Sequence, residues 1–395
     1  MWNRNLVILL AAQTIAVSGS VLIVTVGGLI GSTLSANPAL ATLPLSVLVL
    51  GTAAAAVFAA MLMRRVGRRF GCAIGAVIAA TGAFVSAYGL YADSFVLFCV
   101  GIGAWGVNNA FVQQYRFAAA ESVSAAFASR AISFVLLGAI GGAICGPALA
   151  TAGQNLISQH EYMGAMLAIG ALQLVAILLF AAFREPSPAD TPLTAARGRS
   201  LREIVMQPTY LVAMAASVVG YGVMNLVMTA TPLSMHVYDG HSLGDTAWVI
   251  QSHVLAMYVP SFFSGFLIAR LGVVRIVALG IAALTATLIA GLWGHQVVHY
   301  WWALVTLGVG WNFLFVGGTA LLVESYRPAE RFEAQAVNEF AVFGASAAAS
   351  LLAGTLIHAW GWNTVLWSIA PMLLLVSVAL LMLPRAAGEP SPAAR

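Results

Sequence analysis

Long apolar segments, separated by short stretches rich in turn residues and arginine, constrain this chain more than any other feature. An α-helix rises 1.5 Å per residue, so about 20 apolar residues cross a hydrocarbon layer of roughly 30 Å. Twelve segments reach that length: residues 5–31, 39–63, 70–91, 95–117, 131–152, 162–183, 208–236, 245–269, 273–293, 299–323, 335–358 and 362–384. The sequence therefore predicts an all-α membrane protein of twelve transmembrane helices.

The composition excludes a water-soluble domain, because 61% of the residues are hydrophobic and only 8% are charged. A transmembrane β-barrel would show short alternating segments, whereas these runs are continuous, so helices must satisfy the backbone in lipid. The first segment is longer than the core of a signal peptide, and no convincing small-residue cleavage site follows it. It is counted as the first transmembrane helix.

The positions of the basic residues predict the orientation. The chain has no lysine, and its 17 basic residues are all arginine. They fall at the chain ends, in the centre and after alternate apolar segments, which places them on one side of the membrane. By the positive-inside rule that side, with both termini, is cytoplasmic, and the predicted location is the bacterial inner membrane. The net charge of +4 then needs no nucleic-acid partner, although anionic membrane lipids would benefit from it.

Internal repetition divides the chain into two halves. The predicted units are an N-terminal six-helix half (1–183), a cytoplasmic linker (184–207) and a C-terminal six-helix half with a short cytoplasmic tail (208–395). The segment 60–67 (AMLMRRVG) resembles 265–272 (GFLIARLG), and Gly101-Ile-Gly resembles Gly308-Val-Gly. Repeats of this kind place a substrate path at the interface between the halves.

At the segment 60–69 the chain resembles the major facilitator superfamily, whose loop between helices two and three carries Gly-x-Leu-x-Asp-Arg-x-Gly-Arg-Arg. Four arginine and glycine positions of this signature match, but Arg64 stands where the family has an acidic residue, and Ala269 takes the equivalent place in the second half. The resemblance covers essentially the whole chain and implies the fold of that superfamily working by alternating access. One such fold carries many different substrates.

Charged residues near the predicted cytoplasmic ends are candidates for gating ion pairs between the halves. They are Arg65, Arg68, Glu121, Arg130, Glu324 and Arg331. The alternative is that they are ordinary helix-end charges.

Two motifs inside neighbouring predicted helices carry soft metal ligands: Met224 and Met228 in one, His253 and Met257 in the next. A spacing of four puts each pair on one helical face. Counted from the outer ends of the helices at 1.5 Å per residue, Met228 lies ~12 Å deep and Met224 ~18 Å deep. By the same count, His253 and Met257 of the next helix lie ~14 and ~20 Å deep, so the two pairs are at the same level. If the faces turn toward each other, three thioethers and an imidazole surround one point.

Thioether sulfur and imidazole suit copper(I), whereas zinc usually recruits thiolate or carboxylate, so the predicted cargo is copper. The alternatives are methionines that merely fill helix interfaces, and a His253 that relays protons or packs through a hydrogen bond. The two motifs also resemble those of the CcoA-like copper importers. That resemblance implies copper uptake for assembly of haem-copper cytochrome oxidases, with periplasmic or cytoplasmic copper carriers as partners and no permanently bound cofactor.

Residues at the predicted outer mouth, Met235, His236 and His241, are candidates for capturing copper before it reaches the deeper site. The alternative is that neutral histidine is tolerated wherever lysine and arginine are excluded.

A proton-coupled drug or metabolite antiporter is the second functional hypothesis. It rests on Gly142-Ala-Ile-Cys-Gly146-Pro147, which resembles a pattern of efflux members, although small residues also serve close helix packing. The sequence contains no catalytic constellation or phosphate-binding loop, so it predicts a carrier rather than an enzyme. We expect this carrier to be a monomer.

Overall fold

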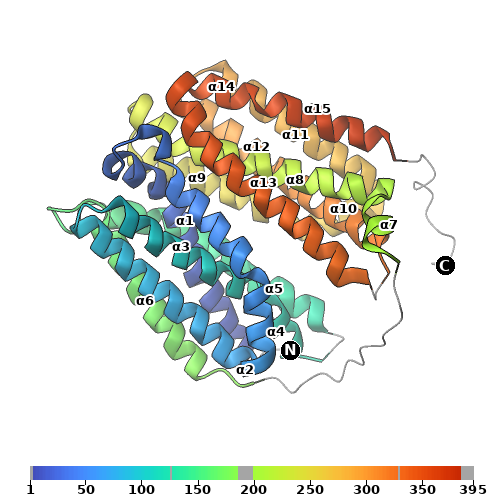
Figure 1. The fold of residues 1–395 in the computed structure, drawn as a ribbon, viewed down its shortest axis with the longest axis horizontal. Helices are drawn as coiled ribbons and strands as arrows, with labels where there is room; N and C mark the ends of the chain where they lie inside the picture. The colour runs from blue at the N-terminus through green and yellow to red at the C-terminus, as the bar shows by residue number, and fades with distance from the viewer. Residues whose placement is uncertain (1–2, 125–126, 186–198, 328–329, 384–395) are drawn as a thin grey trace.

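The computed structural model describes residues 3–124, 127–185, 199–327 and 330–383, and every regular element among them is helical. The helices form two groups, one from each half of the chain, as Figure 1 shows. The predicted boundaries at residues 183 and 207 stay a prediction, and residues 186–198 of the predicted linker lie outside the described residues.

The first group holds six membrane-crossing segments. Its elements are α1 (Arg4–Leu34), η1 (Pro38–Leu40), α2 (Leu43–Tyr91), α3 (Phe95–Val112), α4 (Tyr115–Glu121), α5 (Ala128–Gly153) and α6 (Met163–Ala181). The long α2 contains two of these segments, because Gly67 interrupts it with a φ of +85°. A positive φ favours glycine, which has no Cβ to clash.

The second group repeats this plan. Its elements are α7 (Leu201–Val205), α8 (Pro208–Pro232), the π-helical turn η3 (Leu233–Tyr238), α9 (Leu243–Tyr258), α10 (Ser261–Leu271), α11 (Val273–Trp293), α12 (Val297–Ser325), α13 (Arg331–Trp360), α14 (Trp362–Trp367) and α15 (Ile369–Leu381). Gly272, which the sequence repeat aligns with Gly67, has nearly the same backbone conformation, with φ +81° and ψ 153° against +85° and 167°.

Eleven helical segments of the described residues are long and apolar enough to cross a membrane, against the twelve predicted. The missing one is the predicted continuous helix 245–269. It is instead two helices, α9 of 16 residues and α10 of 11, which meet at Val259 and Pro260. Proline cannot donate a helical hydrogen bond and its ring crowds the preceding turn, so the helix breaks there.

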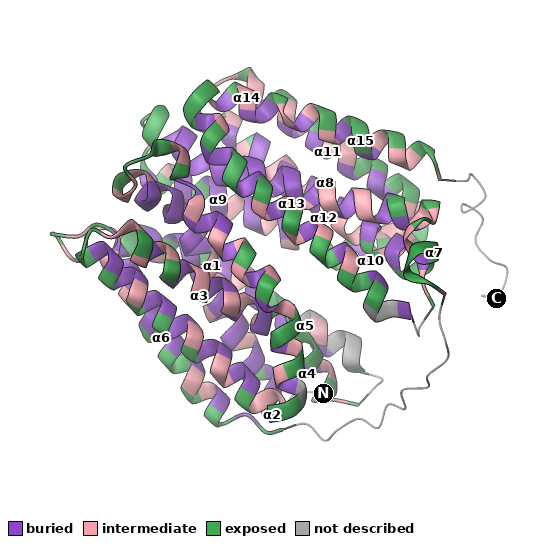
Figure 2. Cartoon of the chain, viewed as in Figure 1, coloured by how far each residue is buried: buried purple, intermediate pink, exposed green. Residues whose placement is uncertain are grey.

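Glycines bring helices within each group into backbone contact. A Cβ added to Gly101 of α3 would lie 2.4 Å from the Gly82 carbonyl oxygen of α2, and one added to Gly310 of α12 would lie 3.1 Å from the Gly280 carbonyl oxygen of α11. Corresponding helix pairs of the two halves, α2 with α3 and α11 with α12, are therefore both packed through glycine, although a Cβ on Gly308, which the repeat aligns with Gly101, would instead lie 2.6 Å from the His253 carbonyl oxygen of α9. Figure 2 shows the buried residues gathered between the helices of each group.

The two groups contact each other chiefly through α2 and η1 with α13 and through α5 with α9, and α1 also contacts α8. The Thr42 hydroxyl at the start of α2 donates a 2.9 Å hydrogen bond to the Ser350 carbonyl of α13. Nearby, a Cβ on Gly28 of α1 would lie 3.7 Å from Leu233 of η3. We call this end of the molecule, where His236 and His241 lie, the histidine end. The groups diverge toward the opposite end, where α7 and the α12–α13 connection lie (Figure 1).

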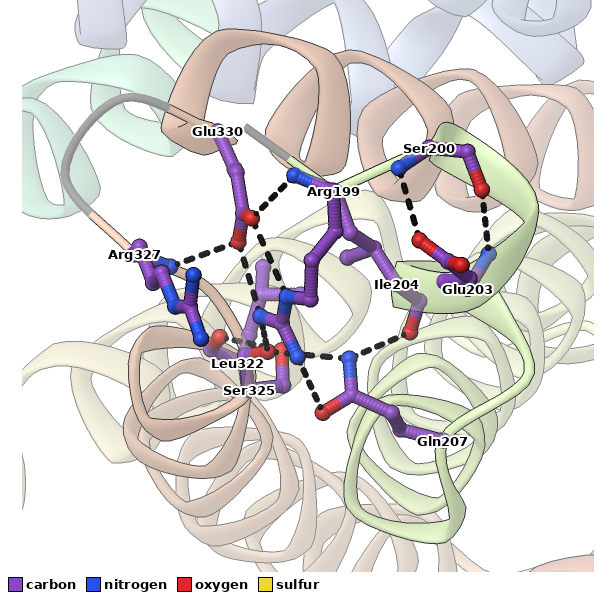
Figure 3. Close-up of polar contacts among 9 residues, drawn as sticks. All are labelled: Arg199, Ser200, Glu203, Ile204, Gln207, Leu322, Ser325, Arg327 and Glu330. Carbon is purple, nitrogen blue, oxygen red and sulfur yellow. Dashed lines mark hydrogen bonds and ion pairs between the residues drawn. The ribbon is translucent and has the colours of Figure 1, made fainter. Parts of the chain in front are cut away.

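That opposite end, which we call the arginine end because Arg68, Arg199 and Arg327 lie there, contains a buried charge cluster (Figure 3). Glu330, whose side chain is 1% exposed, pairs with the Arg199 guanidinium at 2.7 Å and accepts hydrogen bonds from the backbone N–H groups of Arg199 and Arg327. Arg199 also donates to Gln207 and to the Ser325 carbonyl. The Arg199 guanidinium, together with these backbone donors, lowers the pKa of Glu330 to about 2. This cluster fastens α7 to the α12–α13 connection.

Candidate functional site

The four predicted metal ligands all lie in the interior of the second half. Met224, Met228 and Met257 are each 7% exposed, and His253 is fully buried. The structure gives the His253 ring a partner on α12: its Nδ1 lies 2.7 Å from the Leu304 carbonyl oxygen, while its Nε2 has no hydrogen-bond partner. This bond matches the packing role that the sequence left open for His253. That the four side chains form one cage stays a prediction.

The predicted capture residues belong to a hydrogen-bonded cap at the histidine end. Nδ1 of His236 lies 2.7 Å from the His241 carbonyl, and Nε2 of His241 lies 2.7 Å from the His295 carbonyl. The His295 ring pairs with Asp239 at 2.9 Å. Met235 is fully buried. The hydrogen bonds of His236 and His241 join neighbouring loops. Among the described residues no group of three or more His, Cys, Asp or Glu is arranged to hold a metal ion, and the capture role stays a prediction.

Of the predicted gating residues, Arg68 and Glu121 form an ion pair at 2.6 Å, but within the first half, between α2 and α4. Glu185 caps the turn after Gly67 by accepting hydrogen bonds from the backbone N–H groups of Arg68 and Arg69. Glu185 thereby places a carboxylate beside this loop, in which Arg64 replaces the acidic residue of the superfamily signature.

The other gating candidates divide into two exposed residues and two whose side chains the structure leaves undescribed. Arg65 and Glu324 are exposed, whereas the side chains of Arg130 and Arg331 lie outside the described part of the chain. The three ion pairs of the described residues each join groups within one half or between the linker end and the second half. The gating role therefore stays a prediction.

Sequence reasoning missed an aromatic cluster in the second half. We define it by five residues: Tyr221 of α8, Tyr258 of α9, Trp311 and Phe315 of α12, and Phe343 of α13. The Trp311 and Phe315 rings stack with centroids 5.1 Å apart, and Tyr221 meets both edge-on at 5.2 and 5.7 Å. Phe343 and Tyr258 extend the cluster, each with a ring centroid 6.3 Å from its neighbour's.

This cluster is only partly enclosed. Four of its rings are half-buried, and the buried Trp311 keeps an indole N–H that has no hydrogen-bond partner. Asn225 lies one turn beyond Tyr221 on α8 and is also half-buried. Aromatic faces beside an unsatisfied indole N–H and a half-buried amide suit a planar organic molecule. The spacing of four between Trp311 and Phe315 was the available sequence signal, but spacing does not say which rings from other helices will meet them.

The first half contributes polar groups on α1 and α3. The Ser20 hydroxyl donates to the Asn109 side-chain oxygen at 3.0 Å and accepts from the Trp105 indole at 3.1 Å. These groups lie within the first half, on α1, which contacts α8 of the second half, and on α3.

The glycine motif behind the antiporter hypothesis packs α5 onto α1. A Cβ on Gly142 would lie 2.5 Å from Val17, and one on Gly146 would lie 2.7 Å from the Ser18 carbonyl. This geometry is the close helix packing that the sequence also allowed.

Two groups of helices that are long and apolar enough to cross a membrane, packed against each other, are the architecture of a multi-pass membrane transporter. The sequence model of the Major Facilitator Superfamily matches residues 8–311 and 213–395, and the chain belongs to this superfamily.

Among its relatives, the riboflavin transporter RfnT of Brucella anthropi is 41% identical over 96% of both chains. The uncharacterized transporter YdeG of Bacillus subtilis is 29% identical over 90% of this chain and 86% of that one. Solved structures share the fold. The nucleoside transporter NupG superposes with a TM-score of 0.73 at 13% identity, covering 99% of this chain and all of that one. A bacterial Spinster homologue in an inward-facing, unoccupied conformation gives 0.72 at 15% identity, covering 95% of each.

These comparisons confirm the superfamily and overturn the copper assignment. The relationship to a riboflavin transporter contradicts copper import, the supply of cytochrome oxidase assembly and the copper-carrier partners, and the resemblance to CcoA-like importers is not supported. Two four-residue spacings of Met and His recur easily in apolar helices, because methionine is a common filler of helix interfaces. Such short motifs could not outweigh a likeness that extends over the whole chain.

Proposed function

We propose that this chain carries riboflavin, or a flavin of the same shape, across the bacterial cytoplasmic membrane. The observation that carries the proposal is its 41% identity to a riboflavin transporter over 96% of both chains. The arginine end would face the cytoplasm, with both termini on that side, as the positive-inside rule predicts.

The aromatic cluster supports this proposal chemically. The isoalloxazine ring system of riboflavin is planar, aromatic and uncharged, and such a ring stacks favourably on Trp and Tyr. Its ribityl chain carries hydroxyl groups, which need hydrogen-bonding partners once they leave water. Asn225 in the second half, and Ser20 with Asn109 in the first, offer such groups on contacting helices.

Alternating access gives the proposed transport cycle. The two halves would rock about the interface, so that the aromatic cluster is exposed to one side of the membrane at a time. The described structure has the halves in contact at the histidine end and diverging at the arginine end (Figure 1), which is the arrangement of a carrier open toward the cytoplasm.

Uptake of radiolabelled riboflavin tests the proposal. The chain would be expressed in a bacterium that cannot make riboflavin and lacks its own importer, with the empty vector as control. We expect growth on micromolar riboflavin and label accumulation well above the control. Accumulation equal to the control, with the protein present in the membrane, would refute the proposal.

A further inference from the structure

A basic cavity lies at the arginine end of the first group of helices. Its volume is about 580 Å³, and its walls come from three places in the chain: the start of α1, the turn of α2 around Gly67, and the end of α6 with the residues that follow it. The charged residues of the lining are four arginines and one carboxylate: Arg4, Arg65, Arg69, Arg184 and Glu185. The lining therefore carries an excess of positive charge.

Hydrogen bonds to the backbone hold these three segments together. The Asn5 side chain donates to the Arg184 carbonyl at 2.8 Å and accepts from the Arg184 N–H at 3.0 Å, which joins the start of α1 to the end of α6. Arg69 donates to the Ala181 carbonyl at 2.7 Å, and Glu185 accepts from two backbone N–H groups of α2. The cavity walls are therefore held without the guanidinium groups of the other three arginines.

Those three guanidinium groups are uncommitted. Within the part of the chain that the structure describes, the side chains of Arg4, Arg65 and Arg184 make no hydrogen bond, ion pair or ring contact, and all three are exposed. The carboxylate beside them, Glu185, already accepts a hydrogen bond at each of its two oxygens. A guanidinium group presents paired N–H donors that match the oxygens of a phosphate group. Three such groups around one cavity suit a phosphate-bearing anion.

The cavity lies at the level where membrane-crossing segments begin and end. Arg4 and Arg65 are the first residues of two such segments, and Ala181 is the last residue of a third. All three residues line the cavity. At this level the hydrocarbon layer of a membrane gives way to the lipid headgroups. The lining arginines are therefore at the height of headgroup phosphates.

Exposed apolar side chains continue from the cavity toward the membrane interior. Phe70 belongs to the lining and is 62% exposed. Val7 lies three residues after Arg4 on α1, and Leu178 lies three residues before Ala181 on α6, so each shares a helix face with a lining residue. Val7 is 52% exposed and Leu178 is 71% exposed. A ligand in the cavity thus has positive charge on one side and lipid-facing apolar surface on the other.

We propose that this cavity binds the headgroup of an anionic phospholipid, and that Arg4, Arg65 and Arg184 contact its phosphate. Basic pockets between membrane helices recognise anionic headgroups in this way. The acyl chains of the lipid lie along the apolar surface of α1 and α6. A soluble phosphate ester shares the charged group but has no acyl chains, so it gains only the electrostatic part of the binding free energy. This site does not depend on which substrate the protein transports.

Lipid binding to the purified full-length protein tests the proposal. The protein is freed of lipid in a neutral detergent and titrated with anionic dioleoylphosphatidylglycerol or zwitterionic dioleoylphosphatidylcholine, and native mass spectrometry measures the bound fraction. We expect the anionic lipid to bind more tightly. Arg4→Gln, Arg65→Gln and Arg184→Gln should each weaken its binding about fivefold, the contribution of one arginine near an anionic membrane surface. Binding of the zwitterionic lipid should change less.

Arg270→Gln is the matched control. The sequence repeat aligns Arg270 with Arg65, and Arg270 is exposed but does not line this cavity. Its substitution should leave the dissociation constant of the anionic lipid unchanged. Equal weakening in Arg270→Gln, or no weakening in the three cavity variants, overturns the proposal. Because three separate substitutions are made at exposed side chains, the loss of one variant to misfolding leaves the other two to decide the result.

Glycerol 3-phosphate separates the two sources of a phosphate group. In large molar excess over the lipid it should displace little of the bound dioleoylphosphatidylglycerol, because it cannot bury acyl chains against the protein. Complete displacement would show that the cavity takes a soluble phosphate ester, and would overturn the assignment to a lipid.

Discussion

Trp311 contacts three of the other four rings in the aromatic cluster, stacking on Phe315 and meeting Tyr221 and Tyr258 edge-on. Trp311→Ala removes the largest stacking surface offered to a flavin. Stacking and burial of this kind are worth about 1–2 kcal/mol, so we expect riboflavin to bind roughly tenfold more weakly. Flavin fluorescence quenching measures the change. Trp367→Ala removes an indole that is 60% exposed on the surface, and equal weakening there would argue against the cluster.

Glu330 at the arginine end gives a prediction of pH dependence. Its pKa is lowered from 4.5 to about 2, so it contributes stability that is fully present above about pH 4.5 and is lost as the pH falls toward 2. We expect Glu330→Gln to lower the melting temperature at pH 7, and the difference from the unaltered protein to shrink toward the acidic end. Thermal unfolding in detergent between pH 3 and 8 measures it. Glu333→Gln is the control, because that carboxylate is exposed.

For individual side chains, the sequence predicted the chemical type of many groups but not their partners. The deep burial of His253 follows from its place in an apolar helix, yet its bond to Leu304 depends on how α9 rotates against α12. Likewise Tyr221 and Phe343 are 122 positions apart, and only the packing of α8 on α13 brings their rings together. The predicted copper cage assumed that two helices turn their ligand-bearing faces toward each other. Residue spacing determines which side chains share a face of one helix, but it does not determine how the neighbouring helix is rotated about its own axis.

Helix pairs in this protein depend on glycine where backbones touch. Gly101→Ala would put a methyl group 2.3 Å from the Ser86 hydroxyl and 2.4 Å from the Gly82 carbonyl, which forces α3 away from α2. Overpacking of this size costs about 1–3 kcal/mol, so we expect a lower melting temperature and less protein in the membrane. Gly344→Ala on α13 is the matched control, because an added Cβ there meets nothing within 4 Å. Equal loss in both variants would mean that helix contact is not the cause.

Most of the helices could be predicted from the sequence, because membrane spans need only length and apolarity. Their ends and breaks needed local chemistry as well. Pro260 divides the predicted helix 245–269 into α9 and α10, and Gly67 lets α2 turn between two spans, which the charges of Arg64 and Arg65 also separate in the sequence. A proline inside an apolar run can kink a helix or end it, and tertiary packing decides which.

The contact between the halves at the histidine end gives a prediction for the whole molecule. A Cβ on Gly354 would lie 2.5 Å from the Thr42 hydroxyl oxygen, close enough for a disulfide between Thr42→Cys and Gly354→Cys once the native Cys72, Cys99 and Cys145 are replaced. We expect oxidation to hold this end shut and stop riboflavin uptake, and reduction to restore it. Each single-cysteine variant is a control. Normal uptake by the fully cross-linked protein would contradict a cycle that opens this end.

The glycine contacts inside each half have a mechanical consequence. Helices that touch backbone to backbone leave little free volume, so a bundle built this way resists bending and transmits force as a stiff lever. A substrate bound between two such stiff bundles cannot be accommodated by local deformation of either bundle. In the proposed transport cycle, substrate binding would therefore shift one half relative to the other at the interface between them. Binding would then be coupled directly to the rigid-body movement of the two halves.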